Sequence, residues 1–143
     1  MVKLNSKIIS VSKRNKLTAA TISYNSLASI TEERPWGSFT VLEEGENYKV
    51  KRFIVLPNRR LSLQYHHFRS EHWTIVAGKA LVTCDEQELV LNAGETVFIP
   101  IKAVHRIKNI GVEPVIVIEV QCGSYVGEDD IVRLADDYDR TTK

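Results

Sequence analysis

Residues 61–73 read LSLQYHHFRSEHW and hold three of the four histidines of the chain. An extended strand places alternate side chains on the same face, so Gln64 and His66 point one way and His67 points the other way. Glu71 follows the break at FRS, close enough to turn back toward the first strand. The segment therefore predicts two short strands that bring an amide, an imidazole and a carboxylate together.

Similar short runs continue from residue 48 to residue 121, rich in Val, Ile, Thr and aromatic residues and mostly separated by Gly, Pro, Asn or Asp. They are YKVKRFIVL (48–56), LSLQYHH (61–67), HWTIVAG (72–78), KALVTCD (79–85), ELVLNAG (88–94), TVFIPI (96–101), VHRIKN (104–109) and VIVIEVQ (115–121). Eight or so strands without intervening helices predict an all-β antiparallel sandwich or barrel. The tail at 127–140 mixes apolar and acidic residues in a spacing compatible with a short closing helix.

The composition is that of an ordinary single domain, with 143 residues, 43% hydrophobic residues and a net charge of +1. The chain has no basic excess that would favour nucleic acid, and no apolar run near the ~20 residues of a membrane span. Cys84 and Cys122 lie far apart, and no secretory signal is recognisable. We therefore expect a cytoplasmic protein with no nucleic-acid partner and no membrane partner.

The N-terminus differs from the rest, and we divide the chain into a basic arm at 1–31 and a main domain at 32–143. Residues 1–30 contain five basic residues and no acidic one, which leaves a net charge of −4 for the remainder. The arm is either solvated or adds a strand to the main sheet. A transit peptide is the third reading, disfavoured by a single arginine and a poor amphipathic pattern.

A barrel of these strands could bring Gln64, His66 and Glu71 together with His105, which lies far downstream. Two imidazoles, a carboxylate and an amide oxygen suit one divalent metal ion. Zn²⁺ is the expected ion, with Mn²⁺, Co²⁺, Ni²⁺ and Fe²⁺ as alternatives. Such a set fills only part of the coordination sphere and leaves positions for water or substrate.

Two segments of this sequence resemble the two motifs of the cupin fold. Residues 64–78 have the pattern Q-x-H-x4-E-x6-G, and residues 94–109 have the pattern G-x5-P-x-K-x2-H-x3-N. Lys102 stands where cupins usually have glycine. The resemblance implies a cupin, which is a double-stranded β-helix or jelly-roll barrel.

Longer motifs look like the C-terminal cupin domain of type II mannose-6-phosphate isomerases, which commonly follows a mannose-1-phosphate guanylyltransferase domain. They are RPWGSF (34–39), LSLQYHHFRSEHW (61–73), FIPIKAVHRIKN (98–109), EVQCGSYVGEDDIVR (119–133) and DDYDR (136–140). This chain has no room for the transferase domain, so we expect no guanylyltransferase activity from it. Phe68 replaces the third of three histidines typical of the family, a position outside the four expected ligands.

The resemblance implies a metal-dependent isomerase that interconverts mannose 6-phosphate and fructose 6-phosphate through a cis-enediol. Arg69 is expected to be catalytic and is also the first candidate to hold the phosphate. The further cations expected to bind substrate are Lys102, Arg106 and Arg133. The candidates for proton transfer, among which the sequence does not choose, are His67, Glu128, Asp129 and Asp130.

Each of these assignments has a simpler structural alternative. Gln64 could hydrogen-bond a ligand instead of binding the metal, and Arg69 could pair with a surface carboxylate. The segment GEDDIVR could merely close the barrel, with Asp130 and Arg133 as an ordinary ion pair. The domain could also be a non-catalytic module that binds a sugar or nucleotide sugar, or another cupin enzyme such as an epimerase or a dioxygenase. We expect the isomerase to act on a small-molecule sugar phosphate and to form a homodimer.

Overall fold

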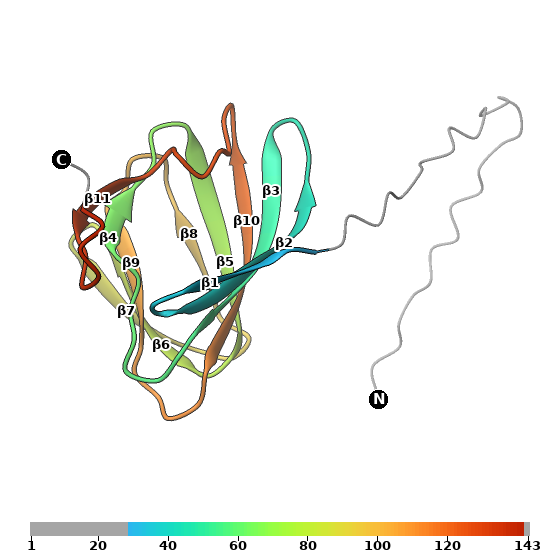
Figure 1. Ribbon diagram of the computed structural model, residues 1–143. Coiled ribbons are helices and arrows are strands. Elements are labelled where there is room, and N and C mark those ends of the chain that lie inside the picture. The colour runs from blue at the N-terminus through green and yellow to red at the C-terminus, as the bar shows by residue number, and fades with distance from the viewer. Residues whose placement is uncertain (1–28, 142–143) are drawn as a thin grey trace, which may run out of the picture.

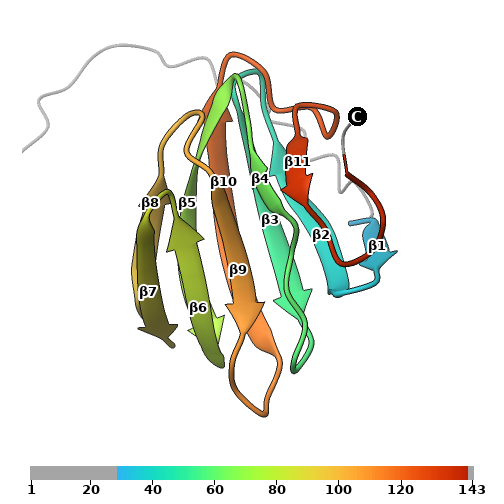
Figure 2. The ribbon, with the colours of Figure 1, turned by 90° about the vertical axis from the view of Figure 1, so that its left-hand side faces the viewer.

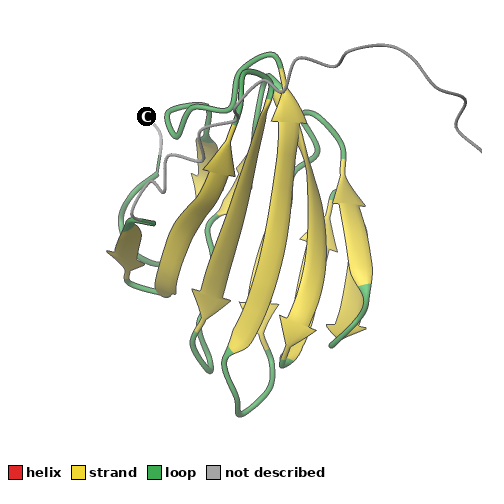
Figure 3. Cartoon of the chain, turned by 90° about the vertical axis from the view of Figure 1, so that its right-hand side faces the viewer, coloured by secondary structure: helices red, strands yellow, loops and turns green. Residues whose placement is uncertain are grey.

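A computed structural model describes residues 29–141, and within that range the chain forms strands and loops without a helix (Figure 3). The strands are β1 (Thr31–Arg34), β2 (Gly37–Glu44), β3 (Tyr48–Val55), β4 (Leu63–Tyr65), β5 (Arg69–Ala77), β6 (Lys79–Cys84), β7 (Gln87–Asn92), β8 (Thr96–Ile99), β9 (His105–Asn109), β10 (Val115–Gly123) and β11 (Val132–Ala135). No helix in this range is long and apolar enough to cross a membrane. Most of the predicted basic arm lies outside the described residues.

The strands form two antiparallel sheets that face each other (Figures 1 and 2). One sheet has the order β1-β2-β3-β10-β5-β8 and the other the order β11-β4-β9-β6-β7. From β4 onward the chain passes repeatedly between the sheets, so strands far apart in sequence become neighbours, as β3, β10 and β5 do. This arrangement confirms the predicted all-β barrel and all eight predicted strands.

Two parts of the fold differ from the sequence prediction. The tail forms strand β11, which pairs with β4, and no helix, so the expectation of a closing helix was wrong. The hairpin β1–β2 precedes the first predicted strand and adds two strands beside β3. A Cβ atom on Gly37 would lie 1.9 Å from the carbonyl oxygen of Ile54, so only glycine lets the hairpin approach this closely.

The barrel interior changes from apolar to charged along its axis. On the inner face of the six-stranded sheet, Phe53, Val117 and Ile75 form one row of cross-strand partners. The next two rows, both buried, are Lys51, Glu119 and Trp73, followed by Lys49, Gln121 and Glu71. The apolar rows supply the core that holds the sheets together, and the charged rows form one wall of the candidate site.

The two cysteines, Cys84 and Cys122, are both free thiols.

Candidate functional site

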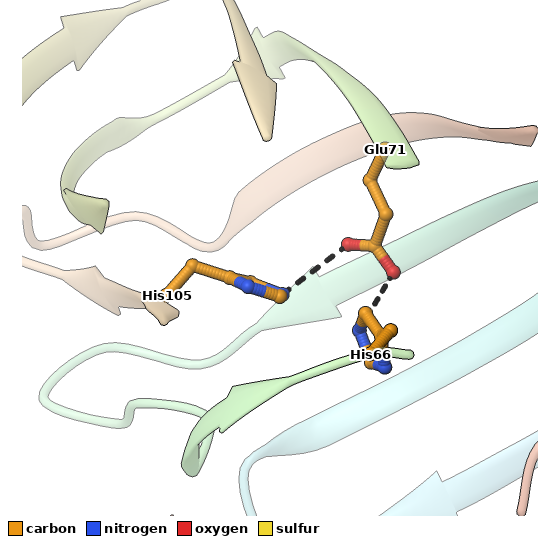
Figure 4. A group of neighbouring side chains, drawn as sticks. All are labelled: His66, Glu71 and His105. Carbon is orange, nitrogen blue, oxygen red and sulfur yellow. Dashed lines mark ion pairs between the residues drawn. The ribbon is translucent and has the colours of Figure 1, made fainter. Parts of the chain in front are cut away.

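His66, Glu71 and His105 meet inside the barrel, with one potential ligand atom of each within 4.8 Å of the others (Figure 4). The Nε2 atom of His66 lies 2.9 Å from Oε1 of Glu71, and Nε2 of His105 lies 3.5 Å from Oε2. All three side chains are buried. The fold thus brings together three of the four residues that the sequence nominated as metal ligands.

Both imidazoles are oriented by backbone carbonyls. Nδ1 of His66 lies 2.6 Å from the carbonyl oxygen of Asp130, and Nδ1 of His105 lies 2.8 Å from that of Ala103. A proton on each Nδ1 serves the carbonyl, so each Nε2 is directed at Glu71. Nε2 of His105 is buried and has no hydrogen-bond partner among residues 29–141. Two oriented imidazoles and a carboxylate fit a divalent cation of borderline hardness.

The carboxylate of Glu71 carries a buried negative charge. Burial alone raises its pKa, but the neighbouring imidazoles of His105 and His66 outweigh burial and hold the pKa well below its ordinary value. Nε of Arg69 and Nε1 of Trp73 also donate to Glu71, at 3.2 and 3.1 Å. A buried carboxylate needs such countercharges, and a metal ion would be one more.

Gln64, the fourth predicted ligand, lies between His105 and Arg133 on the five-stranded sheet. It is the cross-strand partner of His105 on one side and of Arg133 on the other. The hydroxyl of Ser62 donates a 2.6 Å hydrogen bond to its Oε1. The direct coordination of a metal ion by Gln64 stays a prediction.

Glu71 of the cluster lines a pocket with an empty volume of about 720 Å³, which includes open solvent at its mouth. Its aromatic wall comes from Trp36, Phe39, Phe53 and Trp73. The charged residues that line it are Arg34, Lys51, Arg69, Glu71, Glu119, Glu128, Arg133 and Arg140. A polar ligand with anionic charge could enter beside the three clustered side chains.

Arg69 is built into the centre. Its side chain is buried, and besides Glu71 it contacts the carbonyl oxygen of Gly127 at 2.9 Å and Nε2 of His66 at 3.5 Å. The alternative of a surface ion pair therefore does not hold. The contacts make Arg69 a countercharge to Glu71 that is fixed from two sides.

The four candidates for proton transfer occupy different places. Glu128 lines the pocket and pairs with Lys51 at 2.5 Å and Lys49 at 3.3 Å. Burial raises the pKa of Glu128, but the two lysines outweigh burial and lower it overall. Asp129 instead accepts a hydrogen bond from the hydroxyl of Tyr125 and does not line the pocket.

Asp130 and His67 also lie outside the pocket lining. The carboxylate of Asp130 accepts hydrogen bonds from the backbone amides of His67, at 2.9 Å, and Phe68, at 3.1 Å. The exposed ring of His67 packs against Tyr65 and Phe68. In this geometry Asp130 fastens the segment that carries His66.

Of the cations predicted to bind substrate besides Arg69, only Arg133 lines the pocket. Lys102 is exposed, and its φ of 65° lies in the left-handed region, which suits the glycine usual in cupins. Its backbone amide donates to the carbonyl oxygen of His66. Arg106 lines a separate depression on the five-stranded sheet, with Arg60 and Lys108.

The polar residues that β3 and β10 place inside the barrel were not among the predicted site residues. Glu119 accepts a 3.0 Å hydrogen bond from Nε1 of Trp73, and burial together with the charge of Glu71 raises its pKa well above the ordinary value. Gln121 donates to Glu119, while its own buried Oε1 has no hydrogen-bond partner in the described chain. The signal was present in the alternating charges of residues 48–56 and in the pair of polar residues at 119 and 121.

Replacement of Asp130 by alanine tests its fastening role. Asp130→Ala leaves two amides without acceptors, so we expect the free energy of unfolding to fall by about 2 kcal/mol. We also expect metal affinity to fall by about ten-fold, because the loop that orients His66 loosens. Urea denaturation and metal titration measure both effects. Exposed Asp129→Ala is the control, and equal effects in the two variants would refute the role.

The sequence of this chain is similar to the sequences of several known proteins. The family described as mannose-6-phosphate isomerase C-terminal matches residues 24–136. The alginate biosynthesis protein AlgA of Pseudomonas aeruginosa is 51% identical over 110 residues, which are 77% of this chain and 23% of the relative. A mannose-1-phosphate guanylyltransferase of Escherichia coli K12 is 48% identical over 107 residues, which are 75% of this chain and 22% of the relative. The chain therefore spans about a quarter of the length of these relatives.

Solved structures with lower identity share the fold. The capsular polysaccharide assembling protein CapF of Staphylococcus aureus has a TM-score of 0.67 at 23% identity, over 76% of this chain and 34% of its own. The cupin domain of Schizosaccharomyces pombe Cnp3 has a TM-score of 0.61 at 19% identity, over 68% and 72%. Oxalate decarboxylase of Bacillus subtilis, a protein with Mn(II) centres, has a TM-score of 0.66 at 20% identity, over 76% and 30%. These matches identify the barrel as a cupin.

Proposed function

Because this chain belongs to the mannose-6-phosphate isomerase C-terminal family, we propose that it is a metal-dependent isomerase that interconverts mannose 6-phosphate and fructose 6-phosphate. The observation that carries the proposal is the buried His66–Glu71–His105 cluster beside a pocket with several basic residues. A sugar phosphate requires both features, one for the oxygens of the reacting carbons and one for the phosphate. The sugar-phosphate partner, the homodimer and the cytoplasmic location stay predictions.

His66, Glu71 and His105 would hold the metal ion, with Gln64 as the fourth candidate. A bound divalent ion would polarise the carbonyl and hydroxyl oxygens of the substrate and stabilise negative charge on them. Zn²⁺ remains the expected ion, and Mn²⁺, Co²⁺, Ni²⁺ and Fe²⁺ remain alternatives, because a mixed nitrogen and oxygen set does not select among them.

The residues of the pocket have separate roles in the proposed reaction. Glu128 is the only predicted base that lines the pocket, where its carboxylate is held by Lys51 and Lys49. We assign the proton transfer between the two carbons to it. Arg69 holds Glu71 in place, and the aromatic wall of the pocket limits the access of water.

The test is an isomerase assay on the full chain, stripped of metal and reloaded with each of the five ions. We expect interconversion of the two sugar phosphates with at least one ion, and a large loss of turnover with retained metal in Glu128→Gln. An absence of turnover with every ion would refute the isomerase. Metal and sugar-phosphate binding without turnover would favour the non-catalytic binding module, and turnover of another sugar derivative would favour an epimerase.

A further inference from the structure

Three arginines from three separate parts of the chain line the same pocket as Glu71 of the metal cluster. Arg34 ends β1, Arg133 lies in β11, and Arg140 lies in the tail after β11. The sequence separates Arg34 from the other two by about a hundred residues, and only the packing of the N-terminal hairpin near the C-terminal tail brings them together. A pocket lined by several guanidinium groups favours an anionic ligand.

The charges of the three groups act on one another. Burial lowers the pKa of Arg133, the positive charges of Arg140 and Arg34 lower it further, and the negative charge of Asp136 acts in the opposite direction. The guanidinium groups of Arg34 and Arg140 therefore lie near that of Arg133.

The guanidinium groups of Arg34 and Arg140 are held in place by contacts that use only some of their N–H donors. Arg140 binds Asp136 through Nη2 at 2.8 Å and Nε at 3.0 Å, and its guanidinium lies 5.1 Å from the ring centre of Tyr138. Arg34 donates to the side chain of Glu32 and to the backbone of Glu33. These side-chain bonds involve two nitrogens of each group, which has five N–H donors in all.

The position of Arg133 relates this cluster to the metal centre. Arg133, Gln64 and His105 are successive cross-strand partners on β11, β4 and β9. Neighbouring strands lie about 4.8 Å apart, so the backbones of Arg133 and His105 are about 10 Å apart. A hexose phosphate can span this separation, with its carbonyl end at the metal cluster and its phosphate at the arginines.

We propose that Arg34, Arg133 and Arg140 form the phosphate-binding end of the pocket and hold the dianionic group of the sugar phosphate. The identity of the sugar rests on the proposed function, whereas the phosphate follows from three guanidinium forks facing one pocket. Arg69 also lines the pocket, but its side chain is buried against Glu71 at the metal cluster, so we assign it to that carboxylate. Lys102 and Arg106 lie outside the pocket lining.

The experiment measures the dissociation constants of mannose 6-phosphate, inorganic phosphate and unphosphorylated mannose for the metal-loaded full chain by calorimetry. Arg34→Gln, Arg133→Gln and Arg140→Gln should each weaken mannose 6-phosphate and inorganic phosphate by about ten-fold or more, because each removes a charge-assisted hydrogen bond. Mannose binding and metal content should stay unchanged. Arg52→Gln is the matched control, since Arg52 is exposed on β3 and lies outside the pocket.

Arg140→Gln also removes a tail contact, so Arg34→Lys provides a variant that keeps the charge but loses the fork. It should fall between wild type and Arg34→Gln in phosphate affinity. Wild-type phosphate affinity in all three glutamine variants would overturn the proposal, even if the chain proves to be an isomerase. An equal loss in Arg52→Gln would overturn it as well. If the wild-type chain showed no turnover but the glutamine variants specifically lost phosphate binding, the phosphate site would be supported and the proposed isomerase refuted.

Discussion

His105→Ala is expected to lose its metal ion and, with it, the isomerase activity. His105 supplies one of three clustered ligands, and its Nε2 is a buried atom that no protein group satisfies among the described residues. Loss of a group that merely orients a ligand costs about 10- to 100-fold in metal affinity, so loss of a ligand should exceed 100-fold. Elemental analysis after dialysis and the assay of sugar-phosphate interconversion measure the two effects.

His72→Ala is the matched control, because His72 is exposed on the outer face of β5 and stacks on Phe98 at 4.6 Å. It should keep its metal and its activity. Unchanged metal content in His105→Ala would remove His105 from the ligand set, whatever happens to turnover.

Arg69→Met is expected to destabilise the protein strongly, and more so without metal than with it. Arg69 is the buried cation beside the carboxylate of Glu71, and loss of one partner of a buried ion pair costs about 3–5 kcal/mol. We expect a loss of this size in the free energy of unfolding of the metal-free protein, measured with urea. A bound ion supplies another countercharge to Glu71, so the loss should shrink in the metal-loaded protein. Turnover should fall in either case.

Arg52→Met makes the same exchange at an exposed site on β3 and should change the stability by no more than about 0.5 kcal/mol. If Arg69→Met cost as little, or cost the same with and without metal, Arg69 would not be the countercharge of Glu71.

Local patterning was sufficient to predict most of the strands. Runs of six to nine residues rich in β-branched and aromatic side chains favour strands, and each of the eight runs contains a strand in the structure. The three strands that escaped prediction are β1, β2 and β11. Residues 31–34 read TEER and have no apolar alternation, so β1 exists because β2 offers a partner. β11 likewise depends on the free edge of β4.

The alternation of residues 48–56 indicated a strand but not which face is buried. Antiparallel strands usually bury their apolar face, yet here Lys49 and Lys51 point inward while Arg52 is exposed. The two buried lysines are tolerated because the carboxylate of Glu128, in a loop some eighty residues away in the sequence, pairs with both. No local pattern carries that information.

The sequence by itself predicted the β-rich class from local patterning, and its resemblance to the cupin motifs indicated the family and nominated His66, Glu71 and His105. Only the tertiary structure decided which charges reach the pocket. It placed Arg34 and Arg140 beside Arg133, left Lys102 and Arg106 outside, and turned Arg69 onto Glu71. The physical reason is that the positions of these long side chains depend on partners from distant strands, whose register is set only when the two sheets pack.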